Sequence, residues 1–302
     1  MTKNPPYLQK DDVIGLVCPA GFMAIDRIQN CIRTLGDWGY RVKIGKTLGN
    51  DPVNYFSGTD EERQSDLQQM LDDDEIKAIL CARGGYGTSR IIDGLDFSHF
   101  KENPKWIVGY SDITVLLTHI YRNFKITCIH GPMAGAFNDE GYKNEFVLSL
   151  KEALEGKKTR YTIDLSPLAR KGEGIGELVG GNLSMLIHLM GSPSEVKTKG
   201  RILFLEDIGE YYYKIDRMFL QLKRAGKLDN LAGLILGGFT DMQDTRLKFG
   251  QEIQELIFDK VKEYDYPVCF DFPVGHQDKN YALKVGAGYK LKVGKNKVVL
   301  EE

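Results

Sequence analysis

Apolar and polar positions follow two different patterns along the 302 residues. In the first half, short runs of consecutive apolar residues are separated by segments in which apolar positions recur at helical spacing. Strands that are apolar on both faces are typical of a parallel sheet covered by helices on each side. The pattern therefore predicts a doubly wound α/β domain over residues 1–155. Its expected strands are 13–18, 40–44, 76–82, 106–109 and 126–129, and its expected helices include 24–38 and 60–71.

The pattern changes after about residue 155. Residues 156–175 are polar and rich in glycine, which predicts a linker. Residues 176–302 mix strand and helix patterns and end in short strand-like segments separated by glycines, typical of antiparallel pairing. A mixed α/β second domain is therefore expected. Its expected strands are 202–205, 231–236, 268–270, 282–285, 288–293 and 297–300, and its expected helices are 182–190, 216–223 and 251–261.

Composition narrows the functional classes. The 40 basic and 42 acidic residues leave a formal net charge of −2, which gives no electrostatic drive toward nucleic acid or an anionic membrane. We find no run of about 18 apolar residues, the length a membrane helix needs. The polar, proline-containing N-terminus does not resemble a secretory signal. We therefore expect a cytoplasmic protein with neither nucleic acid nor membrane as a partner.

The five cysteines are scattered and odd in number, with no Cys-x-x-Cys motif and no Cys/His cluster. This spacing argues against a zinc site or a disulfide framework. We expect reduced, structural thiols and no metal.

In open α/β sheets, ligands bind beyond the carboxyl ends of the strands. The expected strand 106–109 ends at Tyr110-Ser111-Asp112 and is followed at once by a helical pattern. A serine between a strand and a helix N-terminus is the position of a nucleophile elbow, where helix N–H groups face a developing oxyanion. The alternative is that Ser111 only caps the helix.

Another strand exit carries Arg83-Gly84-Gly85-Tyr86-Gly87. These glycines could form a tight turn or cradle a phosphate. No Gly-Lys-Ser/Thr follows, and the first strand lacks a Gly-x-Gly-x-x-Gly exit, so both common nucleotide motifs are absent. Backbone N–H groups of this loop would serve an oxyanion hole if the loop faced Ser111.

A serine nucleophile requires a base. His119 and His188 lie in apolar helical patterns and His99 in a polar segment, whereas His130 and His276 both lie in loops at strand ends. Position alone does not choose between the last two. The strand 202–205 leads into Glu206 and Asp207, either of which could hold a histidine Nδ1–H or simply be a solvated cap.

Taken together, several motifs resemble the LD-carboxypeptidase family of serine peptidases. They are Gly-Tyr-Ser-Asp-Ile-Thr (109–114), Leu-Glu-Asp-Ile-Gly-Glu (205–210) and Val-Gly-His (274–276), with support from 83–87, 130–133, 180–183 and 213–218. The resemblance covers nearly the whole chain in order.

The resemblance implies Ser111 as nucleophile, His276 as general base and acid, and Glu206 as the partner of the histidine. The oxyanion hole maps to the N–H groups of Gly85 and Asp112. Arg83 and Asn182 are candidate substrate-binding residues, Arg83 for a terminal carboxylate. The implied fold is a flavodoxin-like N-terminal domain with a C-terminal swivelling β-barrel-like domain, often as a homodimer, without metal or cofactor.

The implied activity is release of a terminal D-alanine from murein tetrapeptides, as in peptidoglycan recycling. A second hypothesis keeps the chemistry and changes the substrate to a peptidyl- or aminoacyl-nucleotide, as in microcin-C immunity peptidases. That substrate needs an aromatic platform, for which Tyr211-Tyr212-Tyr213 is the candidate. A third hypothesis is a non-catalytic small-ligand binding protein whose Ser111 is only a helix cap.

Overall fold

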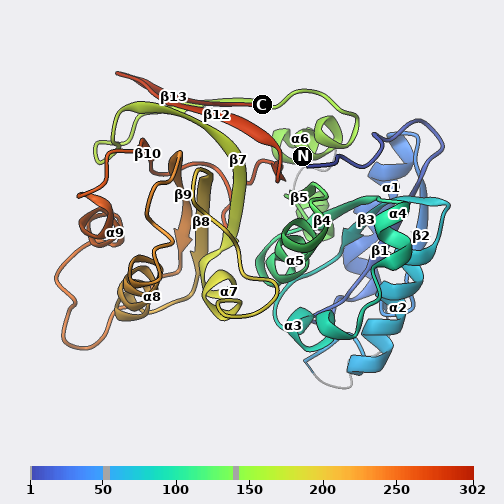
Figure 1. Ribbon diagram of the computed structural model, residues 1–302. Coiled ribbons are helices and arrows are strands. Elements are labelled where there is room, and N and C mark those ends of the chain that lie inside the picture. Colours follow the sequence, from blue (N-terminus) through green and yellow to red (C-terminus); the bar gives the residue numbers. More distant parts are fainter. Residues whose placement is uncertain (1, 50–54, 139–142) are drawn as a thin grey trace. The chain divides into compact units, whose positions relative to one another are not determined.

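The computed structural model describes residues 2–49, 55–138 and 143–302 (Figure 1). The chain forms two compact units. Unit 1 comprises residues 1–157 and 281–285, and unit 2 comprises residues 158–280 and 286–302. Each unit contains its own sheet and helices, so the molecule is a mixed α/β protein with two sheets.

Unit 1 is built on a six-stranded sheet whose first five strands along the chain are parallel. In sheet order its strands are β11 (Leu283–Val285), β5 (Cys128–His130), β4 (Trp106–Gly109), β3 (Ile76–Cys81), β1 (Val13–Val17) and β2 (Arg41–Ile44). Its α-helices are α1 (Gln29–Asp37), α2 (Asp60–Asp72), α3 (Thr88–Ile91), α4 (Ser98–Glu102), α5 (Thr114–Phe124) and α6 (Glu145–Leu154). Short 3₁₀ turns lie at η1 (Ile25–Ile28), η2 (Ile92–Gly94), η3 (Ser111–Ile113) and η4 (Ala134–Asn138).

Helices cover both faces of this sheet. On one face, Ile14 and Leu16 of β1 share a core with Leu35 of α1 and Leu150 of α6. On the other, a Cβ at Gly15 would lie 2.8 Å from Sδ of Met70 in α2, so this helix packs directly on the strand. Strands β1, β4 and β5 are buried along their whole length, as expected inside a parallel sheet, whereas the edge strand β2 is largely exposed.

Unit 2 has a seven-stranded mixed sheet. In sheet order its strands are β10 (Val268–Cys269), β9 (Gly233–Thr240), β8 (Ile202–Ile208), β7 (Gly172–Asn182), β12 (Gly288–Val293), β13 (Lys297–Glu301) and β6 (Arg160–Asp164). Its helices are α7 (Leu183–His188), α8 (Tyr212–Arg224) and α9 (Ile253–Val261). Strands β7, β8, β9 and β10 run parallel, and β12, β13 and β6 extend the sheet by antiparallel pairing.

The predicted linker at 156–175 is wrong where it contains β6 and the start of β7. Strand β6 alternates exposed and half-buried residues at a sheet edge, so its apolar content is low. The glycines of β7 let neighbouring backbone segments pack closely against the strand, and they do not mark a flexible segment. A Cβ at Gly174 would lie 1.7 Å from the carbonyl oxygen of Ala232, so a side chain there would not fit.

The tail of the chain also differs from the prediction. Residues 281–285 were expected in the second domain, but β11 pairs antiparallel with β5 in unit 1. Its side chains explain the assignment, since Leu283 and Val285 are buried and the N–H of Ala282 donates to Oγ of Ser149 at 2.9 Å. Strands β12 and β13 form the antiparallel hairpin that the glycine spacing predicted.

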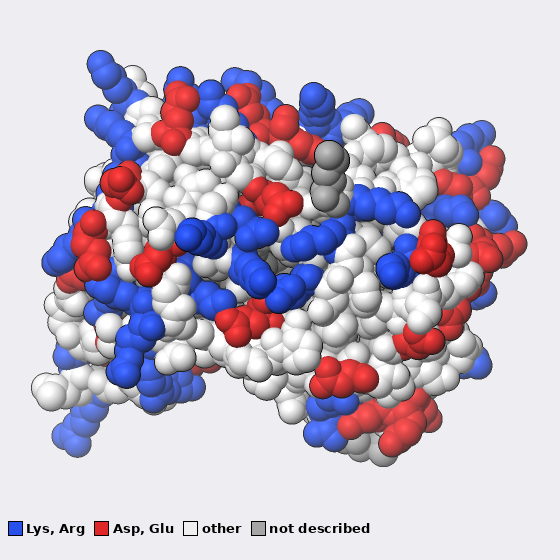
Figure 2. Space-filling view, in the orientation of Figure 1, with Lys and Arg blue, Asp and Glu red and all other residues white. Residues whose placement is uncertain are grey.

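Charged side chains of both signs are interspersed on the face shown in Figure 2, in agreement with the near-balanced composition. Among the described residues, no helix is both long enough and apolar enough to cross a bilayer.

Candidate active site

Ser111 occupies a strained turn between β4 and α5. Its φ is +62°, in the left-handed region that residues with a side chain rarely adopt. Tyr110 before it is extended, and the 3₁₀ turn begins with the bond from the N–H of Ile113 to the Tyr110 carbonyl at 3.2 Å. The N–H of Asp112 precedes that first bond and is one of the donors that a helix start leaves for other acceptors. The turn therefore has the backbone geometry of a nucleophile elbow.

The glycine loop after β3 lies directly against Ser111. A Cβ at Gly84 would lie 2.9 Å from Cβ and 3.2 Å from Oγ of Ser111, so only glycine fits this approach. Gly85 follows with a φ of +98°. The structure thus brings together the nucleophile candidate and the loop predicted to supply an oxyanion donor.

The side chain of Asp112 is buried beneath this loop. Its Oδ2 accepts a hydrogen bond from the N–H of Thr88 at 2.8 Å. Burial raises the pKa of Asp112 above its ordinary value, although the hydrogen bonds from Thr88 and Gly87 and the charge of Arg63 act in the opposite direction. The carboxyl group is a structural bond acceptor rather than a group open to solvent.

In unit 2, Glu206 and His276 form a hydrogen-bonded pair. Oε2 of Glu206 lies 2.6 Å from Nδ1 of His276 and also accepts the backbone N–H of His276 at 3.1 Å. Glu206 is fully buried, whereas the His276 side chain keeps 15% of its surface exposed. An acceptor at Nδ1 fixes the proton there and leaves Nε2 as the basic nitrogen.

The electrostatics of the pair favour a charged imidazole. Burial of the His276 ring opposes its protonation, but the hydrogen bond and charge of Glu206, helped by Asp207, outweigh the burial. The net effect raises the pKa of His276 above its ordinary value. A carboxylate so placed stabilises the imidazolium that forms when a histidine accepts a proton.

Two glycines make room for Glu206. Gly275 has a φ of +101°, and a Cβ there would lie 2.5 Å from both Cβ and Oε2 of Glu206. A Cβ at Gly237 would lie 3.3 Å from Cβ of Glu206 and 2.5 Å from the carbonyl oxygen of Val274, which is in the same loop as Gly275. Thr240 holds the loop from the other side, since its hydroxyl donates to the His276 carbonyl at 2.6 Å.

Asn182 and Asp207 belong to a network around the start of α7. Nδ2 of Asn182 donates to Oδ1 of Asp207 at 3.0 Å, and its Oδ1 caps the helix by accepting the N–H of Met185 at 3.2 Å. Burial raises the pKa of Asp207, while bonds from Ser184 and Ile208 partly offset the rise. Asn182 was predicted as a substrate contact, and in the structure its side chain caps α7 and holds Asp207.

Two other predicted candidates lie in unit 1. Arg83 is exposed, and its Nη1 donates to the carbonyl of Phe22 at 2.6 Å. His130 is fully buried at the end of β5, with its ring centroid 5.7 Å from that of Tyr110. His119 packs against Phe97, as the apolar helical pattern suggested. The sequence left His130 and His276 open as the base, and the structure places the carboxylate of Glu206 at Nδ1 of His276.

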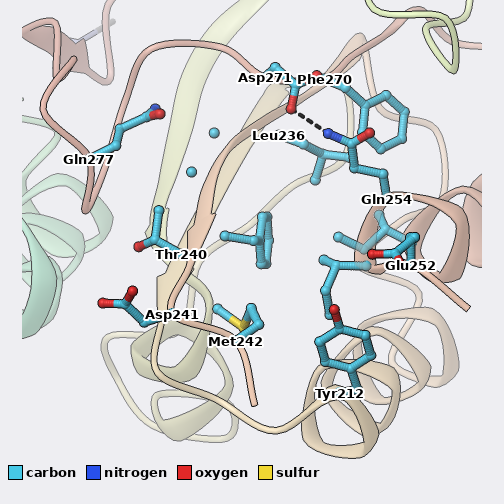
Figure 3. A pocket seen from close by; sticks show the side chains of 15 residues that line it. Tyr212, Leu236, Thr240, Asp241, Met242, Glu252, Gln254, Phe270, Asp271 and Gln277 are labelled. Atoms are coloured by element: carbon cyan, nitrogen blue, oxygen red, sulfur yellow. Dashed lines mark hydrogen bonds between the residues drawn. The ribbon is translucent and has the colours of Figure 1, made fainter. Parts of the chain in front are cut away.

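A polar cavity of about 620 Å³ lies beside the His276 loop, at the carboxyl ends of β9 and β10. Gln277 lines it, and Figure 3 shows Thr240 and Asp241 on one side with Tyr212 on the other. This is the edge at which parallel strands place ligands.

No cluster of three potential metal ligands occurs among the described residues. The five thiols are free and buried, and burial raises the pKa of Cys18 to about 11. These thiols are therefore poor nucleophiles.

Sequence reasoning did not single out Arg63, which is fully buried and bonded to the loops around Ser111. The two residues before it, Glu61 and Glu62, are acidic and exposed, a pattern typical of a solvated helix face. The tertiary packing that buries it leaves no local signal.

Comparison with known proteins points to one family. Residues 14–131 match the model of the LD-carboxypeptidase N-terminal domain, and residues 175–291 match that of the LD-carboxypeptidase C-terminal domain. The chain is 38% identical to a probable murein peptide carboxypeptidase of Bacillus subtilis, over 99% of this chain and 94% of that protein.

Two solved structures extend the comparison. A muramoyltetrapeptide carboxypeptidase from Oxalobacter formigenes superimposes with a TM-score of 0.86 at 27% identity, covering 96% of this chain and 98% of that one. The microcin C7 self-immunity protein MccF, in complex with aspartyl sulfamoyl adenosine, gives a TM-score of 0.86 at 23% identity. This match covers 100% of this chain and 98% of MccF. The second likeness concerns the fold alone.

Proposed function

Because the chain belongs to the LD-carboxypeptidase family of peptidases, we propose that it is a serine carboxypeptidase that releases the terminal D-alanine of murein tetrapeptides. The observation that carries the proposal is the 2.6 Å contact between Oε2 of Glu206 and Nδ1 of His276, which fixes the proton on Nδ1 and makes Nε2 the basic nitrogen of the ring. The left-handed turn at Ser111 supports it from the other unit.

The proposed reaction begins when Oγ of Ser111 attacks the carbonyl carbon on the L-centre side of the scissile amide. Nε2 of His276 takes the hydroxyl proton, and Glu206 stabilises the resulting imidazolium. The N–H groups of Gly85 and Asp112 donate to the oxyanion. Collapse breaks the C–N bond, and His276 returns its proton to the departing amine of D-alanine.

Water completes the cycle. His276 deprotonates it, the hydroxide attacks the ester of the acyl-enzyme, and the tripeptide leaves with a new carboxylate while Ser111 regains its proton. The scheme uses Ser111, Glu206 and His276 of this chain and needs no cofactor.

The finer fold description supports this scheme. The parallel strands of unit 1 follow the order β2-β1-β3-β4-β5, the order of flavodoxin-like sheets, and Ser111 follows β4. We propose that description for unit 1 and the swivelling, barrel-like description for unit 2. We likewise propose the cytoplasmic location expected from the composition, and the homodimer and role in murein recycling that the family resemblance implies.

Release of free D-alanine from L-Ala-D-Glu-meso-diaminopimelate-D-Ala tests the function. We expect turnover by the wild type and none by Ser111→Ala, because removal of the nucleophile leaves only background hydrolysis. Ser65→Ala, an exposed serine on α2, is the matched control and should keep the wild-type rate. A Ser111→Ala protein as active as the wild type would refute the assignment.

An aminoacyl-nucleotide substrate is the second candidate, and one observation favours it. The rings of Tyr211 and Tyr213 lie 5.6 Å apart, and the Arg217 guanidinium lies 5.6 Å from the Tyr213 ring centroid. Tyr213 is 41% exposed, so a base could stack there. Labelling of Ser111 by a fluorophosphonate without D-alanine release would favour this substrate. Absence of labelling and of turnover would favour the non-catalytic binding protein.

A further inference from the structure

Helix α2 carries a buried guanidinium, that of Arg63. The side chain is fully buried, and its Nη1 donates to the carbonyls of Pro19 at 2.6 Å and Gly87 at 3.1 Å. Its Nη2 pairs with Asp60 in the same helix, and its Cζ lies 4.8 Å from the centroid of the Phe56 ring. A buried cation is costly unless its donors are used, so these contacts hold Arg63 in one orientation.

The peptide group that joins Gly87 and Thr88 is hydrogen-bonded at both its oxygen and its hydrogen. The carbonyl of Gly87 and the N–H of Thr88 belong to one peptide, and that N–H donates to Oδ2 of Asp112 at 2.8 Å. Arg63 thus holds the oxygen of this peptide while Asp112 holds its hydrogen. Asp112 is also the residue that follows Ser111 in the chain.

The glycine loop is anchored at its other end as well. The carbonyl of Gly84 accepts the N–H of Gly21 at 3.0 Å. Between the two anchors lie only Gly85 and Tyr86, and a run so rich in glycine would sample many conformations without them. A φ of +143° and a 2.8 Å approach of Arg63 Nη1 to the position of a Cβ make glycine necessary at residue 87.

We propose that Arg63 and the carboxylate of Asp112 are positioning residues that clamp the Gly87–Thr88 peptide and thereby aim the N–H of Gly85 at the oxyanion. The inference rests on the proposed function, because it assigns the loop to the oxyanion hole. The clamp acts on the transition state, so its loss should lower kcat more than it raises KM.

Arg63→Met tests the clamp. Loss of a well-aimed oxyanion donor costs about 10²- to 10³-fold in kcat, so a loosened one should cost about 10- to 100-fold, with KM within about threefold of the wild type. Arg63→Lys should recover part of kcat, because an ammonium can still donate to a carbonyl. Lys105→Met is the matched control. Lys105 is 2% exposed and donates to the carbonyls of Met70 and Asp73, remote from the loop.

Hydrogen exchange of the Thr88 amide supplies a readout independent of catalysis. Asp112→Ala should accelerate this exchange, whereas Asp112→Asn, which retains an acceptor oxygen, should change it less. Arg63→Met should accelerate it and Lys105→Met should not. All variants are compared well below their unfolding midpoints.

The possible outcomes distinguish a failure of the clamp from a failure of the proposed function. Equal losses of kcat in Arg63→Met and Lys105→Met, or an unchanged Thr88 exchange in Arg63→Met, would overturn the clamp. A wild-type protein that neither hydrolyses the tetrapeptide nor reacts with a fluorophosphonate would refute the proposed function, and with it the oxyanion role of the loop. Faster Thr88 exchange in Arg63→Met, together with a loss of kcat that Lys105→Met does not share, supports both the clamp and the proposed function.

Discussion

At His276, burial and a neighbouring carboxylate act on the same proton in opposite directions. The carboxylate of Glu206 prevails, and the pKa of the imidazole rises above its ordinary value near 6.5. A general base must be neutral, so kcat/KM should increase with pH through a midpoint above 6.5. Charging of His276 favours the folded state below pH 6.5, and this contribution disappears as pH rises through the folded-state pKa.

Glu206→Gln removes the charge and keeps the shape. The pKa of His276 should fall, so the acidic limb of the kcat/KM profile should move to lower pH, while kcat drops on the order of 10²- to 10⁴-fold. Asp207→Asn is the matched control, since Asp207 is a secondary cause of the shift and should move the limb less. A limb that stays in place in Glu206→Gln would contradict the assigned pair.

Among individual residues, the place of Ser111 at the end of an apolar strand could be predicted, whereas position in the sequence did not choose between Glu206 and Asp207. His276 could not be separated from His130 by position, and the family resemblance made that choice. The burial of Arg63 could not be predicted, because it depends on loops at residues 19 and 87 that only the fold places around it.

At the scale of elements, the β3–α3 loop and the β4–η3 turn depend on one another. Gly84→Ala would place a methyl group 2.9 Å from Cβ of Ser111 and 3.3 Å from the N–H nitrogen of Asp112, so the loop or the turn must move. A displacement of this kind should lower kcat about 10- to 100-fold. Steady-state release of D-alanine measures it.

Gly36→Ala is the matched control for that substitution. Gly36 lies in helix α1, where a Cβ would meet nothing within 4 Å, and it should gain about 0.5–1 kcal/mol of stability with unchanged activity. Wild-type kcat in Gly84→Ala would mean that the loop does not depend on this approach.

Strands with a regular apolar pattern were predicted well, and strands without one were predicted poorly. Strand β1 is a continuous apolar run and β3 is one apart from Lys77, so both lie within one residue of their predicted ends. Strand β6 alternates polar and half-buried positions, and β7 is rich in glycine, which in a sequence indicates a turn or linker. Close backbone approach explains the glycines of β7, and that approach is set by distant residues.

At the scale of the whole molecule, the chain returns from unit 2 to complete the sheet of unit 1 with β11. A local pattern could not reveal this, because any sheet edge could accept a short apolar strand. The consequence is that unit 1 depends on residues near the C-terminus. Its stability should therefore respond to a substitution at Leu283, although this residue lies far along the chain from Lys157, where the first segment of unit 1 ends.

The two tryptophans make this dependence measurable. Trp38 and Trp106 both belong to unit 1, so their fluorescence reports the unfolding of that unit. Leu283→Ala deletes a fully buried side chain and should reduce the stability seen by fluorescence by about 2–5 kcal/mol. Leu247→Ala, at a residue that is 87% exposed, should leave the midpoint within experimental error. If residues 176–302 formed an independent domain, Leu283→Ala would leave the tryptophan transition unchanged, so an unshifted midpoint would show that unit 1 folds without β11.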